Sequence, residues 1–284
     1  MTAGNCIELI RAAGVAWMED RAPRMGAALA YYTIFSLAPL LIIAIALAGL
    51  FFGEQAARGQ VAHQIQSLVG RDGAIAIEEM LKAAQVPSSS ITATITGFLI
   101  FLFGAMAVFG ELQDALNTIW KVPPKPSYGW LDFVRERLLS FSMILVVAFL
   151  LLVLLVVSAV LSSVIGWFET WLTVSLAHLT DFALSMFVVT GLFAMIFKLL
   201  PNAKIAWRDV WLGSTITALL FLGGRFLIGL YLGRSTLTSA YGAAGSFAVL
   251  LIWLYYSAQV FLFGAELTYQ FARRFGSAHM TNPL

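Results

Sequence analysis

The sequence predicts an all-α membrane protein, a polytopic bundle of six transmembrane helices with a helical hairpin outside the membrane. Two observations predict this fold. Of the 284 residues, 60% are hydrophobic and only 11% are charged, whereas a soluble domain carries about 25% charged residues. The apolar residues also recur in blocks of about 20 or more, the length that a helix needs to cross about 30 Å of hydrocarbon. A soluble globular fold is therefore excluded.

Each apolar block is predicted to be a helix, because only internal hydrogen bonds satisfy the backbone in lipid. The predicted spans are residues 27–52, 91–112, 138–166, 178–200, 210–232 and 242–271. Around this transmembrane domain, which covers residues 27–272, we expect a cytoplasmic interfacial helix in residues 1–26 and a cytoplasmic tail in residues 273–284.

Basic residues in the connections predict the orientation, because cytoplasmic loops carry an excess of Lys and Arg. Of the 17 Lys and Arg residues, twelve lie on the side that holds both termini and four lie on the opposite side. The last, Arg225, lies inside the fifth span. Both termini are therefore expected in the cytoplasm.

Three connecting segments have patterns of their own. Residues 54–86 are too polar to insert, but apolar residues repeat there at helical spacing on both sides of a GRDG turn, and Glu78 and Lys82 are spaced for an i,i+4 pair. We interpret this segment as a helical hairpin over the outer face. The N-terminal segment has the mixed apolar and charged pattern of an interfacial helix, and the loop KVPPKP (121–126) is expected to be extended. We assign no chemistry to either of these two inner segments.

Three stretches together resemble one known family. They are RAPRMGAALAYYTIFSLAPLL (21–41), GELQDALNTIWKVPP (110–124) and the long block from LPNAKIAWRDVWLG to AYGAAGSFAVLLIWLYYSAQVFLFGAEL (200–267). In their order and spacing they are similar to the YihY/BrkB family of bacterial inner-membrane proteins. The resemblance covers nearly the whole chain. It implies a six-helix inner-membrane protein of unsettled activity, from a family that has carried both a virulence-factor label and a ribonuclease BN label.

The residues argue against a nuclease. Hydrolysis of RNA needs a positioned acid and base, or a metal cluster, beside a basic surface. The net charge is only +2, no basic tract is present, and His63, His178 and His279 lie too far apart for a metal motif. We therefore expect no enzymatic activity, no metal or other cofactor, and no nucleic-acid partner.

Polar side chains at the inner ends of the spans form a candidate site. An ionisable residue at the centre of a membrane helix costs about 2.5 to 3.5 kcal/mol. Such a residue therefore needs a shallow position in the membrane, a partner side chain or a water-filled cavity. The second span runs inward and places Glu111 about 30 Å from its outer end, near the inner hydrocarbon boundary. The expected inner-side polar site consists of Glu111, Asp114, Asn117, Glu266, Tyr32 and Ser36. Pro39, on the same face as Tyr32 and Ser36, is expected to kink the first span.

Two interpretations of the carboxylates stay open. In the first, Glu111 and Glu266 pair with Arg21, Arg24 or Lys198 and only hold helices together. In the second, they form a binding or proton-coupling site.

Two charged residues in the outer leaflet are predicted to form a pair. Arg225 lies about 24 Å along the fifth span, and Asp181 lies at a comparable depth in the fourth. Snorkelling of Arg225 to headgroups and contact with an anionic substrate group are the alternatives.

For function, buried polar groups and a kinked first helix favour a transporter or exporter-like permease. Isolated charges in apolar surroundings suit an amphipathic substrate, so a lipid or lipid-linked envelope precursor is expected, besides the lipid bilayer itself. The alternative is a non-transporting envelope scaffold or accessory membrane subunit. Whether a pathway needs a homo-oligomer is left open.

Overall fold

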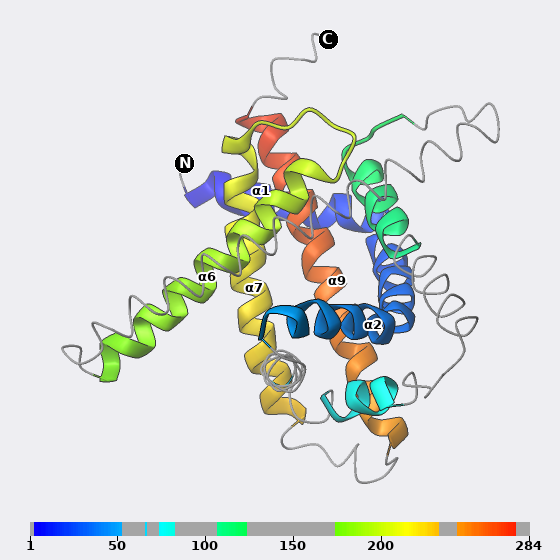
Figure 1. Ribbon diagram of the computed structural model, residues 1–284. Helices are drawn as coiled ribbons and strands as arrows, with labels where there is room; N and C mark the ends of the chain where they lie inside the picture. The colour runs from blue at the N-terminus through cyan, green and yellow to red at the C-terminus, as the bar shows by residue number, and fades with distance from the viewer. Residues whose placement is uncertain are drawn as a thin grey trace. The chain divides into compact units, whose positions relative to one another are not determined.

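The computed structural model describes residues 3–52, 66, 74–82, 107–123, 174–232 and 243–276. Within these ranges every regular element is a helix (Figure 1). The labelled helices are α1 (Ala3–Glu19), α2 (Ala22–Phe52), α6 (Val174–Leu199), α7 (Trp207–Leu232) and α9 (Ala243–Arg274). Residues 74–82 and 107–119 are helical as well. The prediction of an all-α fold is confirmed for this part of the chain.

Several of these helices match the predicted spans. Phe182–Leu199 and Phe247–Arg274 are long and apolar enough to cross a membrane, and α2 and α7, with 31 and 26 residues, also have the length of a span. The third predicted span, 138–166, and most of the second, 91–112, lie outside the described residues. The count of six spans therefore stays a prediction.

The break between α1 and α2 has a local cause. Arg21 adopts a left-handed backbone conformation with φ of 57°, and its N–H bonds to the carbonyl of Met18 at 3.1 Å. This is the geometry of a residue just after a helix C-terminus, where glycine is usual. Pro23 then lies in the first turn of α2, where its missing N–H leaves no helical hydrogen bond unmade. As a result, α2 begins earlier than the predicted span at residue 27.

The chain divides into two compact units. The first unit consists of Met1–Pro23, Leu112–Leu222 and Val260–Leu284, and the second of Arg24–Glu111 and Gly223–Gln259. Helices α7 and α9 each contribute one part to each unit, so each unit is described below by itself.

The core of the first unit joins four helices. Leu9 and Ala13 of α1 are buried against Leu267 of α9, together with partly buried side chains of α7 and α9. Four phenylalanines form a second cluster that joins α6, α7 and α9, with ring centroids 5.0 to 6.1 Å apart. These are Phe193, Phe197, Phe221 and Phe261. Aromatic pairs at such distances add to the gain from burial.

A reciprocal contact brings α7 and α9 together in the first unit. A Cβ atom on Gly213 would overlap Thr268, and a Cβ atom on Gly264 would overlap Thr217. The hydroxyl of Thr217 donates to the carbonyl of Gly213 at 2.7 Å, and that of Thr268 donates to the carbonyl of Gly264 at 2.8 Å. Each helix thus packs a glycine against a threonine of the other helix, which lets the two antiparallel backbones approach closely. We call these four residues the α7–α9 crossing.

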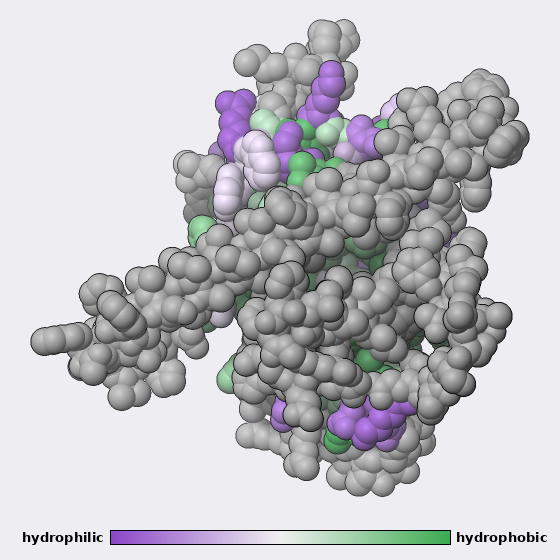
Figure 2. Space-filling view, viewed as in Figure 1, coloured by the Kyte–Doolittle hydropathy of each residue, from purple (hydrophilic) through white to green (hydrophobic). Residues whose placement is uncertain are grey.

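The second unit has a separate core. Ile34 of α2 and Leu250 of α9 are buried with Ala76 and Ile77 of the helix 74–82. On the other side of that short helix, Lys82 pairs with Glu78 at 2.8 Å, and Figure 2 shows hydrophilic residues over it. Residues 74–82 belong to the predicted outer hairpin and have the expected helical spacing, whereas the remainder of the hairpin, apart from Gln66, lies outside the described residues.

Helix α2 is not straight. Figure 1 draws its ribbon with a change of direction between its two ends. The side chain of Pro39 lies outside the described residues, so the assignment of this bend to Pro39 stays a prediction. Exposed aromatic rings mark the first half of the helix, where Tyr31 contacts Phe35 with ring centroids 4.9 Å apart.

Candidate inner-side polar site

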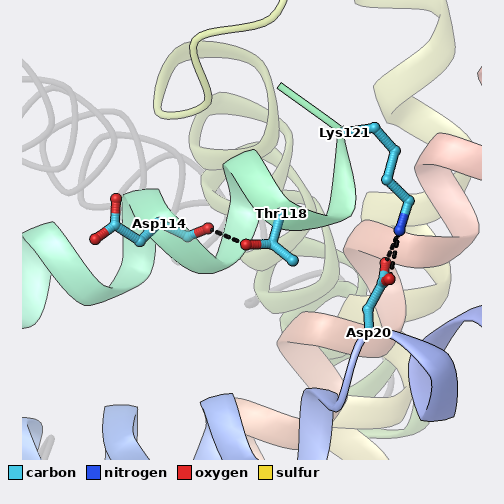
Figure 3. A network of polar contacts seen from close by, with 4 residues as sticks. All are labelled: Asp20, Asp114, Thr118 and Lys121. Carbon is cyan, nitrogen blue, oxygen red and sulfur yellow. Dashed lines mark hydrogen bonds and ion pairs between the residues drawn. The ribbon is translucent and has the colours of Figure 1, made fainter. Parts of the chain in front are cut away.

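An ion pair joins two segments of the first unit that lie 101 residues apart in the sequence. The ammonium of Lys121, just after the helix 107–119, contacts both carboxylate oxygens of Asp20, just after α1. Figure 3 shows the two side chains pointing toward one another. The Lys121 side chain is 52% exposed, whereas that of Asp20 is only 11% exposed. The pair therefore spans the boundary between solvent and the interior of the unit.

Local backbone structure places Lys121 for this contact. Its N–H bonds to the carbonyl of Thr118 at 3.1 Å, and the N–H of Val122 bonds to the carbonyl of Asn117 at 2.9 Å. This double hydrogen bond is a Schellman motif, which normally ends in glycine. Lys121 instead holds φ at 54°. A non-glycine residue in this region costs about 1 kcal/mol or more, and such strain is concentrated at functional sites.

Glu266 of α9 is the central residue of the site. It is completely buried; its carboxyl group interacts with that of Asp20, and no other hydrogen-bond partner reaches its oxygens within the described part of the chain. Asp20, Lys121 and Glu19 are the charged side chains close enough for their fields to act on it. Burial of an ionisable group costs free energy unless hydrogen bonds or an opposite charge compensate for the lost water. Glu266 therefore lies at a position where its burial lowers the stability of the fold.

Aromatic side chains join α9 to the segment that carries Lys121. The ring of Tyr269, one helical turn further along α9, packs edge to face with Trp120 at a centroid distance of 5.4 Å. The guanidinium of Arg273 lies 5.6 Å from the centroid of the same tyrosine, a distance typical of a cation–π contact. The indole N–H groups of Trp120 and Trp17 are buried, and neither has an acceptor among the described residues.

Asn117 has a structural role in the first unit. Its side-chain oxygen accepts a hydrogen bond from the N–H of Asn202 at 2.8 Å, and the amide of Gln113 donates to the carbonyl of Leu200 at 3.1 Å. Both contacts hold the connection between α6 and α7 against the helix 107–119. The ammonium of Lys198 closes this connection by donating to the carbonyl of Ile205.

The structure places the other predicted site residues differently. Asp114 is exposed; its backbone carbonyl accepts a hydrogen bond from Thr118 at 2.8 Å, and its side chain points away from Lys121 (Figure 3). Glu111, half-buried, belongs to the second unit. The convergence of all six predicted residues therefore stays a prediction, since three belong to each unit.

Tyr32 and Ser36 of the second unit differ in environment. Tyr32 is 39% exposed, whereas Ser36 is buried. The hydroxyl of Ser36 donates to the carbonyl of Thr33 in its own helix at 3.1 Å. The predicted outer-leaflet pair cannot be placed in the same way, because the side chains of Arg225 and Asp181 lie outside the described residues.

The expected ion pairs of Glu266 with Arg21 or Lys198 are not found among the described residues. The ammonium of Lys198 is bound to a backbone carbonyl, Arg21 is exposed, and Glu266 has no salt bridge or hydrogen bond to either. The ion pair that joins helices here is Asp20 with Lys121, in the two inner segments to which the sequence assigned no chemistry. The sequence signal for Lys121 was a basic residue at the end of a helix, but nothing in the sequence indicated its partner.

Among the described residues, no group of three or more His, Cys, Asp or Glu side chains is arranged to hold a metal ion. Such a group would be the usual minimum for a protein metal site.

The long apolar helices of the described residues are those of an integral membrane protein. The model of the Virulence factor BrkB family matches residues 14–283. The chain belongs to this family, and the resemblance to the YihY/BrkB family is confirmed.

Curated relatives share this membrane character. A UPF0761 membrane protein of Ralstonia nicotianae is 28% identical over 88% of this chain and 55% of its own length. One of Tolumonas auensis is 27% identical over 93% of this chain and 86% of its own length, and one of Rhodospirillum centenum is 27% identical over 93% and 57%. The chain thus spans a little over half of the length of the Ralstonia and Rhodospirillum relatives. No solved structure matches the chain.

Proposed function

We propose that this protein is a transporter or exporter-like permease of the bacterial inner membrane, and that its substrate is an amphipathic molecule such as a lipid or lipid-linked envelope precursor. The proposal includes six spans, cytoplasmic termini and no enzymatic activity. One observation carries it, the complete burial of the Glu266 carboxyl group without a salt bridge to any basic side chain of the described residues.

The burial of the Glu266 carboxyl group costs stability and therefore needs an explanation. In membrane proteins, ionisable side chains inside the bundle usually mark substrate or ion pathways. Glu266 lies near the inner end of the predicted sixth span, so a group that binds it would enter from the cytoplasmic side.

Other residues already hold the helices of the first unit together. Asp20 and Lys121 join α1 to the helix 107–119, and the α7–α9 crossing holds α9 in place with threonines whose hydroxyls are hydrogen bonded. Neither contact uses the Glu266 carboxylate. Its burial is therefore better explained by a ligand than by helix association.

Transport can be tested with the chain reconstituted in lipid vesicles. Fluorescent phospholipids and lipid-linked sugar precursors are placed in both leaflets, and a membrane-impermeant reductant bleaches those in the outer leaflet. A permease makes the inner-leaflet probe accessible faster than in empty vesicles. The control is the variant Glu8→Gln, whose exposed side chain lies outside the site.

Two results would contradict the proposal. The first is that no probe moves faster than in empty vesicles. The second is that Glu266→Gln transports at the wild-type rate. Either result would favour the alternative, a scaffold or accessory subunit, for which the sensitive positions are expected in the outer hairpin and the inner loops.

A further inference from the structure

The exposed face of α7 in the first unit changes character along the helix. Trp207 and Trp211 are 48% and 46% exposed, and Leu219 is exposed as well. Thr215 is exposed between them, but its hydroxyl donates to the carbonyl of Trp211 at 2.8 Å and needs no partner outside the helix. These four residues follow at intervals of four and so form one row along the helix. The row is aromatic at its start and compatible with hydrocarbon beyond it.

The two indoles lie where the edge of a membrane is expected. Helix α7 begins at Trp207, which is the inner end of the predicted fifth span. Tryptophan is enriched at the membrane–water interface, with its ring at the level of the head groups. Leu219 lies about 18 Å further along the helix axis, which is within the hydrocarbon. The start of α7 is therefore a surface for the head groups of the inner leaflet.

Basic side chains lie at the same end of α7. Lys204, in the connection before the helix, and Arg208, in its first turn, are both exposed. Asp209 is buried, and its Oδ1 atom lies 3.7 Å from Nε of Arg208, which is too long for a hydrogen bond. The guanidinium of Arg208 therefore keeps N–H donors for a group outside the protein.

The connection that carries Lys204 is held in place on both sides. Side chains hydrogen bond to its backbone at Leu200, Asn202 and Ile205, and the side chain of Ile205 is buried. A ligand that binds Lys204 therefore orders little additional backbone, which lowers the entropic cost of binding.

This combination of groups fits an anionic phospholipid. Hydrogen bonds from Lys and Arg to phosphate oxygens are assisted by charge and are therefore strong. Basic residues beside a membrane attract the negatively charged lipids of the cytoplasmic leaflet, whereas the ammonium of a zwitterionic head group would be repelled by them. A soluble phosphate would leave the two exposed indoles unused, so a lipid is the better match.

We propose that Lys204 and Arg208 bind the phosphate of an anionic phospholipid of the inner leaflet, with Trp207 and Trp211 beside its glycerol group and upper acyl carbons. All four side chains are exposed, whereas Glu266 is buried. The lipid is therefore a bound partner of the protein surface and not the substrate of the proposed permease. The inference goes beyond the proposed function, and its test requires no transport.

The experiment is native mass spectrometry of the purified full chain in detergent, titrated with phosphatidylglycerol or with phosphatidylcholine of the same acyl chains. The fraction of protein that carries one bound lipid gives the apparent affinity. We expect phosphatidylglycerol to bind more tightly by about tenfold or more, because two basic residues contribute. An excess of glycerol phosphate is expected not to displace it.

Variants of exposed residues separate the basic pair from general charge. Arg208→Gln is expected to reduce the preference for phosphatidylglycerol by about fivefold, and addition of Lys204→Gln is expected to abolish it. Lys82→Gln is the matched control, because the side chains of Lys82 and Arg208 are both 70% exposed and Lys82 lies in the predicted outer hairpin. It should keep the preference. Trp211→Ala should weaken binding of both lipids alike, since the indole contact does not depend on head-group charge.

Three results would overturn this site. They are equal affinity for the two lipids, an unchanged preference in the double variant, and a loss in Lys82→Gln as large as that in Arg208→Gln. Displacement of the lipid by glycerol phosphate would also contradict the proposal, because the ligand would then be a soluble anion. Melting temperatures of the variants, measured in the same detergent, confirm that each compared protein is folded.

Discussion

Two faces of α9 at the same level of the first unit have opposite properties. Gly264 and Thr268 lie on the face toward α7. There each glycine packs against a threonine of the other helix, and each threonine hydroxyl is hydrogen bonded. Glu266 lies about 200° around the helix from both. There the carboxyl group of Glu266 is completely buried and interacts with Asp20, which forms an ion pair with Lys121.

The comparison separates residues that stabilise the fold from a residue that we assign to function. The crossing is complementary in shape and in hydrogen bonding, so changes there should act on stability. The Glu266 face buries an ionisable side chain that has no salt bridge among the described residues. Changes there should therefore act on function and have little effect on stability.

The largest expected effect is at the crossing. Gly264→Val would place a branched side chain where Thr217 lies. Because the added Cβ atom would also lie 2.9 Å from the Cβ atom of Thr217, which no side-chain rotation moves, we expect a loss of stability of about 3 kcal/mol or more. The measurement is the yield of monodisperse protein in detergent together with its melting temperature.

Gly14→Ala is the matched control for this change. A Cβ atom on Gly14 meets nothing within 4 Å, and alanine is the better helix former by up to about 1 kcal/mol. Its melting temperature should equal or exceed that of the wild type. If Gly264→Val melted like Gly14→Ala, close approach of α7 and α9 would be refuted.

A smaller effect is expected from the strain at Lys121. Lys121→Gly and Lys121→Ala both remove the ammonium that pairs with Asp20, but only glycine adopts φ near 54° without strain. We expect the glycine variant to be more stable than the alanine variant by about 1 kcal/mol. Thermal unfolding of both variants in one detergent measures the difference, and a more stable alanine variant would exclude the left-handed conformation.

The smallest effect is expected at the exposed pair of Glu8 with Arg274. The charged groups are 3.7 Å apart, with side chains 74% and 40% exposed respectively. Such pairs contribute about 0 to 1 kcal/mol, so Glu8→Gln should change neither stability nor transport measurably. A clear loss of either in the same assays would mean that α1 takes part in the site more directly than this structure shows.

The sequence predicted the helices better than their contacts. Apolar block lengths located α2, α6, α7 and α9 within a few residues, because a helix in lipid needs a fixed length of apolar chain. The break at Arg21 was missed, since it depends on a left-handed residue that is not glycine. The boundaries of the membrane spans themselves stay predictions.

The candidate site was predicted in part. Glu266 was found because a carboxylate in an apolar block is conspicuous in any sequence. Its neighbours Asp20 and Lys121 were not found, because their pairing is a tertiary contact across 101 residues. In the sequence both residues match ordinary surface charges near a membrane.

Glu266→Gln tests the central claim most directly, when transport and melting temperature are measured on the same preparation. The amide keeps the shape of the side chain and removes the acidic group, which is completely buried. We expect a melting temperature equal to or above that of the wild type, since an ionisable group is no longer buried, together with a loss of transport of about tenfold or more. A variant that loses folded protein, or that transports at the wild-type rate, would contradict the assignment of Glu266 to function.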